Sequence, residues 1–398
     1  MNATPPLPVR RLTPAGQHCF FGYYDVPAAD TDGRHLCHRV EFRDRFPRSG
    51  DVAEIGLVDL APRAEPVFVP LATTLAWNFQ QGSMLQWLPG RPGVCITNVF
   101  EDGRFGAAIC DVQGGERRLL PLPVANVAPD GSAALCIDMA RLYDFRPGYG
   151  YEEAPDPDAD DPAPAASGIW RMELPSGEKR LLISLAEAAA FVDRNGGGIA
   201  DRKVVVNHIT FCPDGSRYLF LLRTFPERPG GEWETFLLTA AARGGDLRMH
   251  PVWGMASDYH WRDPETILVW ARPGPDAGPE LLLIDDRTGE REPLDAVFFR
   301  ADGHCSWSSD RRWVLYDGYP AGDPPRRSLI LYDTVTRRGA TAGEFLSERT
   351  PGERIDLRCD LHPRWMPDGR TVTFDSIHEG YRAMYAADLG PLMEALAR

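Results

Sequence analysis

HPRWMPDGRTVTFD, residues 362–375, contains a short strand pattern, a Pro-Asp-Gly turn and a second strand pattern. Alternating apolar and polar residues on both sides of such a turn predict an antiparallel hairpin. Related hairpin patterns occur further upstream, four clearly and two more loosely. The clear copies are residues 126–138, 208–222, 260–270 and 304–317, and the looser ones are 30–42 and 85–99. The sequence is therefore an internal repeat built from hairpins.

A second recurring element is an apolar strand that ends in an acidic or small polar residue before a turn. Seven such strands follow one another at intervals of 46 to 66 residues, ending at Asp59, Asp111, Glu173, Thr239, Asp285, Asp333 and Asp388. Three or four short strands in each unit, repeated at roughly this spacing, are typical of propeller blades. We therefore predict an all-β, seven-bladed β-propeller with four-stranded antiparallel blades, formed as one domain by residues 1–398.

Two segments interrupt the repeat. An acidic, proline-rich insertion at about 150–167 is predicted to be solvated and mobile, and a short helix is predicted at about 184–194, where Ser184 and Glu187 have capping-box spacing. A second short helix is predicted at the C-terminus. The N-terminal residues lack an apolar signal-peptide core, and no apolar run is long enough to span a membrane.

Charge and cysteine content restrict the partners that we expect. The net charge of −14 argues against nucleic acid, but not against a small anion in a locally basic pocket. The eight cysteines are scattered without a CxxC motif, which favours reduced, buried thiols and a cytoplasmic location. We expect no membrane partner, and the sequence does not indicate an oligomeric state.

Four of the nine histidines share one register, directly ahead of a hairpin turn: His208, His260, His304 and His362. In a propeller, equivalent inner-strand starts of different blades converge near one end of the central channel. His260, His304 and His362 come from consecutive blades and could bind a divalent transition metal such as Mn or Zn, with Asp360 or Cys359 as a further ligand. In the alternative interpretation, each histidine only caps its own turn.

The remaining histidine of this register, His208, has a different neighbourhood. Asn207 precedes it, and Arg223 follows across the hairpin, so an imidazole proton acceptor could lie beside an anion-binding guanidinium. The third blade meets its insertion in a stretch rich in cations and phenols: Arg141, Arg146, Tyr149 and Tyr151. This stretch could contribute to the same site, or it could be an ordinary aromatic loop that packs on the next blade.

The ordered series RRLTP, HCFFGYYD, NHITFCPDG, DYHWRDP, GHCSWSSD and CDLHPRWMPDG resembles the oligogalacturonate lyases and the related propeller-shaped ulvan lyases, from Arg10 to about Asp388. The resemblance implies β-elimination on a uronic-acid-containing oligosaccharide. It also implies a base, a cation for the carboxylate and an acid. The implied catalytic residues are His208 as base, Arg223 and Arg141 as carboxylate partners, and Tyr149 or Tyr151 as acid.

The other expected site residues follow from the same resemblance. His260, His304, His362 and Asp360 are expected to hold the metal, and Asn207, Arg146, Arg358 and Glu379 to bind the acidic oligosaccharide. The sequence departs from the family pattern at two positions. Leu222 stands where members often have a second histidine, and Asp360 stands where these lyases tend to have another histidine.

These departures leave other functions open. One alternative is a non-catalytic propeller of the TolB type that binds a protein or a glycan, which Leu222 favours. A weaker one is a glycoside hydrolase that uses a carboxylate pair from Asp356, Asp360 and Glu379. Retention of four histidines in one register, together with Arg223, favours the lyase, because a scaffold alone does not need them.

Overall fold

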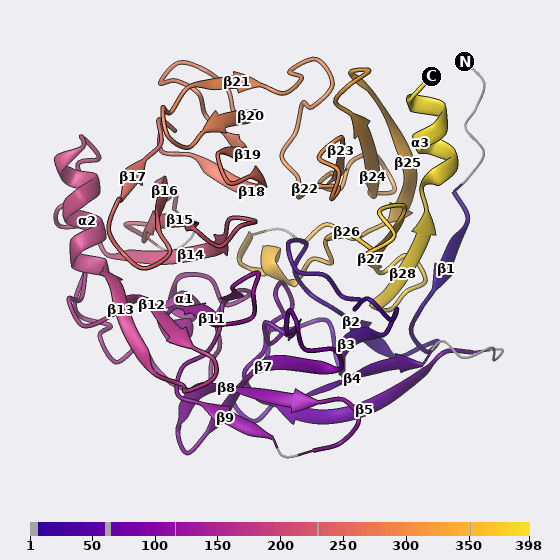
Figure 1. Ribbon diagram of the computed structural model, residues 1–398, viewed down its shortest axis with the longest axis horizontal. Coiled ribbons are helices and arrows are strands. Elements are labelled where there is room, and N and C mark those ends of the chain that lie inside the picture. Colours follow the sequence, from indigo (N-terminus) through magenta and orange to yellow (C-terminus); the bar gives the residue numbers. More distant parts are fainter. Residues whose placement is uncertain (1–6, 60–64, 116, 229–230, 351) are drawn as a thin grey trace.

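The computed structural model describes residues 7–59, 65–115, 117–228, 231–350 and 352–398. It contains seven four-stranded antiparallel sheets arranged around a central axis (Figure 1). The predicted fold class, a seven-bladed β-propeller, is confirmed. Within the described residues, no helix is long and apolar enough to cross a membrane.

The blades follow the chain in order, each from its innermost to its outermost strand. The first four are β2 (His18–Phe20), β3 (His35–Val40), β4 (Ala53–Asp59) and β5 (Val67–Thr74); β6 (Gln86–Trp87), β7 (Val94–Glu101), β8 (Arg104–Asp111) and β9 (Arg118–Leu120); β10 (Asn126–Val127), β11 (Ala133–Cys136), β12 (Gly168–Glu173) and β13 (Lys179–Ser184); β14 (Val204–Phe211), β15 (Arg217–Thr224), β16 (Thr235–Ala241) and β17 (Arg248–Met249).

The last three blades complete the ring. They are β18 (Ala256–Asp263), β19 (Thr266–Ala271), β20 (Glu280–Asp285) and β21 (Arg291–Pro293); β22 (Cys305–Trp307), β23 (Trp313–Asp317), β24 (Arg326–Asp333) and β25 (Arg338–Leu346); β26 (Arg364–Trp365), β27 (Thr371–Ser376), β28 (Ala383–Asp388) and β1 (Val9–Arg11). The N-terminal β1 pairs with β28, with Val9 opposite Ala387, so the seventh blade holds the two ends of the chain together.

The recurring polar-ended strands of the sequence are the third strands of the seven blades, β4, β8, β12, β16, β20, β24 and β28. Their apolar residues fill the space between blades, where Ile109, Ile169 and Leu238 are buried. The Pro-Asp-Gly turns have a structural role. In the turn after β26, Gly369 has φ +63°, and Asp368 Oδ1 accepts a hydrogen bond from Arg370 N at 2.9 Å.

Antiparallel order divides the connections between two faces. The turns from first to second and from third to fourth strand lie on one face. The loops from second to third strand and the connections between blades lie on the other, which we call the rim face. Three longer elements belong to these rim-face connections: α1 (Met139–Phe145), α2 (Leu185–Arg194) and the 3₁₀ helix η1 (Gly352–Leu357).

The helices that the sequence predicted are present. α2 begins after Ser184, whose side chain accepts a hydrogen bond from Glu187 N, while the Glu187 carboxylate accepts one from Ser184 N; this is the expected capping box. At the C-terminus, α3 (Gly390–Leu396) follows β28. All eight cysteines are free, and only Cys110 is not fully buried.

The acidic insertion differs from expectation, because it is anchored. Asp156 is 5% exposed and pairs with Arg141. Glu153 accepts hydrogen bonds from Ser49 Oγ at 2.9 Å and Gly50 N at 2.6 Å, which fastens the insertion to the β3–β4 loop. A guanidinium and hydrogen-bond donors thus hold part of the insertion in place, while Asp160 and Asp161 remain exposed, as composition predicted.

Candidate active site

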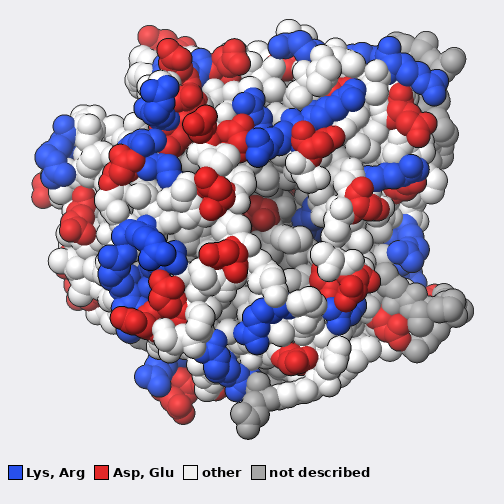
Figure 2. Space-filling view, in the orientation of Figure 1, with Lys and Arg blue, Asp and Glu red and all other residues white. Residues whose placement is uncertain are grey.

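Side chains from six blades meet at the centre of the ring. Figure 2 shows one face of the molecule hollowed at its centre, with acidic and basic side chains visible in the depth of the hollow. We call the converging residues the central cluster: Tyr23, Tyr149, His208, Arg223, Asp258, His304, Arg358, Asp360 and His362. All of them are buried.

His208 projects into this cluster from a β-bulge. The register of β14 against β15 shifts between Asn207 and Ile209, so His208 has no partner in the ladder, and its φ is +49°. Such left-handed backbone is rare for non-glycine residues and is concentrated at functional sites. Asn207 Oδ1 accepts a hydrogen bond from His208 N at 2.8 Å and supports the bulge.

The imidazole of His208 is held by Tyr23. The two rings stack with centroids 5.0 Å apart, and the Tyr23 hydroxyl lies within hydrogen-bond distance of His208 Nδ1 and 3.2 Å from Asp258 Oδ1. Burial, followed by repulsion from Arg223, lowers the pKa of His208 well below its ordinary value. The ring is therefore neutral at neutral pH, the form in which it can accept a proton.

Arg223 is a buried cation without an anion. It is 4% exposed, it forms no salt bridge with any described residue, and its Nε and Nη1 have no hydrogen-bond partner there. Burial, and then Arg146, lower the pKa of the Arg223 guanidinium. Unpaired buried charge is costly, so a site of this kind is built for an anionic ligand. Its neighbour Leu222 is fully buried in the apolar core between blades.

His304 and His362 approach each other most closely among the histidines of the shared register. Their Nε2 atoms are 3.1 Å apart, and Asp360 Oδ2 is 4.0 Å from His362 Nε2. One ligand atom from each of these three residues lies within 4.8 Å of the others. Two imidazole nitrogens on one ion, at bonds of about 2.1 Å, would be about 3.0 to 3.4 Å apart, so this group fits a divalent transition metal.

The surroundings of the pair support the same geometry. Asp317 Oδ1 lies 2.8 Å from His304 Nδ1, and Asp317 Oδ2 accepts a hydrogen bond from His362 N at 3.2 Å. A carboxylate on Nδ1 directs Nε2 towards a ligand, as in many metal sites. His362 also has left-handed backbone, with φ +42°. Without a metal, attraction by Asp258 and Asp317 outweighs burial and raises the pKa of His304 to about 9.

Arginines surround the third possible ligand. Arg327 pairs with Asp360, and Arg358 Nε lies 2.8 Å from Asp360 Oδ2. Attraction by the two guanidiniums outweighs burial and lowers the pKa of Asp360 far below its ordinary value. Asp360 is therefore a permanent anion, and part of its charge is already balanced by the protein before any metal binds.

A chain of charges links the cluster to the third blade. Arg146 pairs with Asp356, and Asp356 Oδ1 also lies 3.1 Å from Arg358 Nη1. Tyr149 lies beside them: its hydroxyl is 3.4 Å from Arg358 Nη2, and its ring meets the ring of His208 edge to face. Tyr149 and Arg146 are thus close to His208, and Arg358 lies beside Tyr149.

Several predicted residues lie elsewhere. His260 does not join the metal group. Its Nδ1 lies 2.8 Å from Trp261 O, and burial lowers its pKa to about 4. Cys359 is also outside that group, with Sγ 3.8 Å from Asp360 O. Glu379 lies on the exposed β27–β28 loop, paired with Arg11 and Tyr381.

Two predicted catalytic residues are engaged in structural contacts. The guanidinium of Arg141 donates to four backbone carbonyls and to Asp156. The hydroxyl of Tyr151 accepts from Asn98 Nδ2 at 2.9 Å, and the residue is 1% exposed. The contacts of Arg141 are thus with the insertion and β14, and those of Tyr151 are with β7 and β8 of the second blade.

Sequence reasoning missed Tyr23, Asp258, Asp317 and Arg327. Tyr23 was present in the quoted stretch HCFFGYYD, so its position in the repeat could have drawn attention to it. Asp258 lies near the start of β18, two residues before His260. Asp317 and Arg327 carry no local pattern, and only the folded ring brings them to the histidines.

Comparison with known proteins shows which solved structures share this fold. No family model and no curated protein matches the sequence, but solved structures do. An oligogalacturonate lyase in complex with manganese aligns with a TM-score of 0.64 at 16% identity, covering 99% of this chain and 98% of that one. The chain has the fold of the oligogalacturonate lyases.

A second solved structure agrees. The oligogalacturonate lyase from Vibrio parahaemolyticus aligns with a TM-score of 0.61 at 14% identity, over 98% of this chain and 95% of that one. The resemblance seen in the sequence is thus confirmed at the level of the fold. At these identities the activity of an oligogalacturonate lyase does not transfer with the fold, and it has to be argued from the site.

Proposed function

We propose that this protein is a lyase that cleaves uronic-acid-containing oligosaccharides by β-elimination. The observation that carries the proposal is that one cluster contains both a neutral imidazole, His208, and a buried guanidinium, Arg223, whose Nε and Nη1 have no hydrogen-bond partner among the described residues. β-Elimination needs this combination, because a proton leaves the carbon next to a carboxylate and the carboxylate gains electron density as it does so.

The residues divide the reaction between them. His208 accepts the proton from C5 of the uronate, and Arg223 pairs with the carboxylate on that carbon. The electron pair of the C5–H bond forms the C4–C5 double bond, and the C4–O bond breaks. Tyr149 donates its proton to the departing glycosidic oxygen. Burial is the main cause that raises the pKa of Tyr149, so the phenol is protonated and able to donate.

Other groups prepare these three. Tyr23 orients His208, and its own hydroxyl faces Asp258. His304, His362 and Asp360 would hold a divalent metal, of which Mn and Zn both suit this donor set. When bound, such an ion adds positive charge that stabilises a carboxylate beside it. Arg146 and Arg358, joined through Asp356, place two further cations along the approach for an acidic oligosaccharide.

The test is the appearance of the unsaturated product. The purified protein, supplied with Mn²⁺ or Zn²⁺, is incubated with a panel of uronate oligomers, and the ultraviolet absorbance of the conjugated C4–C5 double bond is followed. We expect a steady rise with at least one oligogalacturonate. No rise with any substrate in the panel would contradict the lyase and leave the alternative of a non-catalytic, ligand-binding propeller.

Metal binding gives a prediction that does not depend on activity. Replacing His362 with alanine removes one of two nitrogen ligands, and loss of a directly bound ligand should weaken binding of Mn²⁺ or Zn²⁺ by at least about 100-fold in calorimetric titration. The matched control is His260→Ala, which removes a histidine of the same sequence register that lies outside the group. Equal losses in the two variants would contradict this assignment.

A further inference from the structure

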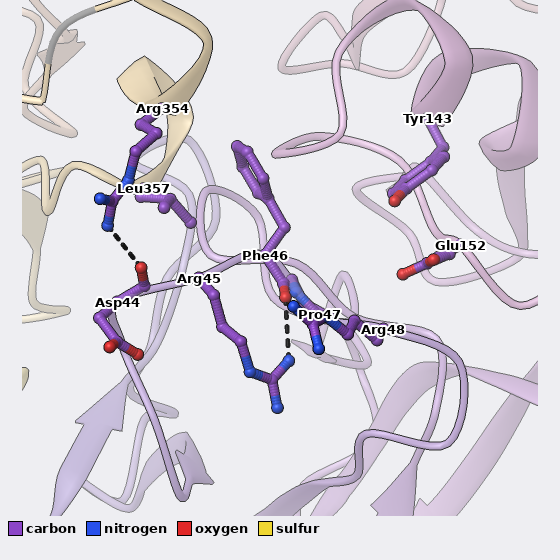
Figure 3. A pocket seen from close by; sticks show the side chains of 9 residues that line it. All are labelled: Asp44, Arg45, Phe46, Pro47, Arg48, Tyr143, Glu152, Arg354 and Leu357. Carbon is purple, nitrogen blue, oxygen red and sulfur yellow. Dashed lines mark hydrogen bonds between the residues drawn. The ribbon is translucent and has the colours of Figure 1, made fainter.

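A groove lies beside the central cluster on the rim face. Its volume is ≈ 420 Å³, and it is bounded by residues 44–48 of the β3–β4 loop, by Tyr143 and Glu152 from the third blade, and by Arg354 and Leu357 of η1 (Figure 3). This volume is within the range of small-molecule sites. The space bounded by Tyr23, Met84 and His208 is much smaller, ≈ 10 Å³.

Both walls of the groove continue into the central cluster. On one wall, Leu357 directly precedes Arg358. On the other, Tyr143 lies three residues before Arg146, which places the two close together at the end of α1. The Arg146–Asp356 ion pair joins the two walls between the groove and Tyr149. The groove and the central cluster thus share the Arg146–Asp356–Arg358 chain of charges, and the units of a bound chain that reach past these residues would enter the groove.

The groove has an available cation. Arg45 is paired with Asp51, and Arg354 donates to the backbone oxygen of Asp44. Arg48 is exposed, and its guanidinium has no hydrogen bond or ion pair with any described residue. Three guanidiniums, those of Arg45, Arg48 and Arg354, share the groove with two carboxylates, those of Asp44 and Glu152. Arg48 is the guanidinium of the three that can pair with the anionic group of a ligand.

The groove also offers aromatic surface. Figure 3 shows the ring of Phe46 between Arg354 on one side and Tyr143 on the other. Phe46 packs against the buried cluster that contains Trp77 and Leu357, so its position is fixed. An aromatic face combined with guanidiniums suits a ligand that has both an apolar ring face and carboxylates. An acidic sugar has both features.

We propose that this groove binds the third uronate unit of the substrate, the one beyond the two units joined by the bond that breaks, and that Arg48 pairs with its carboxylate. The proposal rests on the proposed lyase function and makes it more specific. It gives the enzyme a preference for chains of three or more units over dimers, because a dimer leaves the groove empty.

The experiment compares dimeric with trimeric galacturonate in the wild type, in Arg48→Ala and in a control. The control is Arg287→Ala, an exposed arginine in the β20–β21 turn on the opposite face. Loss of one charge-assisted contact should lower the ratio of kcat/KM for trimer to kcat/KM for dimer by about tenfold in Arg48→Ala. The ratio should be unchanged in the control. A ratio that is the same in Arg48→Ala and wild type would overturn the proposal.

A binding measurement separates this proposal from the lyase itself. If no variant cleaves either oligomer, calorimetric titration with the same dimer and trimer still reports on the groove. Tighter binding of trimer that disappears in Arg48→Ala would support the groove while the lyase function falls. Equal binding of dimer and trimer, or no binding of either, would overturn the groove as well. Arg48 is exposed, so its replacement leaves the folded core intact.

Discussion

His208→Asn should lower kcat by about 100- to 10,000-fold, the usual contribution of a general base. Asparagine is the appropriate replacement because it tolerates left-handed backbone better than most residues, and His208 has φ +49°. The variant should therefore keep the bulge in β14 while it loses the imidazole. The measurement is the initial rate of unsaturated product at saturating substrate, with circular dichroism as the check on folding.

The pH dependence of the wild type belongs to the same prediction. A base must be unprotonated to accept a proton, and burial and Arg223 lower the pKa of His208 well below its ordinary value of 6.5. Protonation of this imidazole should therefore not reduce kcat as the pH falls from 8 to about 6.5. In a His208 with an ordinary pKa, half of the molecules would already be inactive at that pH.

Two outcomes would contradict the role of His208. Full activity in a folded His208→Asn would remove the imidazole from the mechanism. The second outcome compares the double variant Tyr23→Phe/His208→Asn with Tyr23→Phe alone. If the two were equally active, the loss of activity in His208→Asn would be due to the unpaired phenol of Tyr23 and not to the missing base. We expect Tyr23→Phe alone to be milder, because the phenol only positions the ring that accepts the proton.

The fold could be predicted from the sequence because a propeller blade is a local object. Each hairpin and each polar-ended third strand lies within one repeat, so periodicity alone identifies seven of them. The ring then brings equivalent positions together, which is why His208, His304 and His362 could be placed near one another. Their exact neighbours depend on features that the repeat does not encode.

The errors follow from local irregularities. β18 contains register shifts on both sides of His260, so counting from the turn gave the wrong residue for the fifth blade, and Asp258 contacts the cluster instead. The stretch that contains Arg141 and Tyr151 has the composition of a binding site, but composition does not give the direction in which a side chain points. Leu222 suggested a lost function, yet it is in the core and Arg223 points to the cluster.

Arg141→Met should reduce the free energy of unfolding by about 3 kcal/mol, the largest effect on stability that we expect of one substitution. Removing one partner of a buried ion pair typically costs about 3 to 5 kcal/mol, because the other charge remains buried. Here the residue is 1% exposed, and Asp156 and four carbonyl oxygens lose their donor. Lys203 Nζ lies 3.9 Å from Asp156 Oδ2 and still balances part of its negative charge. We therefore expect the loss of stability to be at the lower end of this range.

The measurement is denaturant unfolding, compared with a matched exposed pair. Arg370 and Asp388 are half exposed, so Arg370→Met should reduce the free energy of unfolding far less than Arg141→Met does. Adding Asp156→Asn to Arg141→Met should recover part of the loss, because it removes the stranded carboxylate charge. A folded Arg141→Met with unchanged stability and no lyase activity would instead support the catalytic role that the sequence suggested. If Arg141→Met is less stable but its folded molecules keep the kcat of the wild type, the role of Arg141 is to anchor the insertion beside the central cluster.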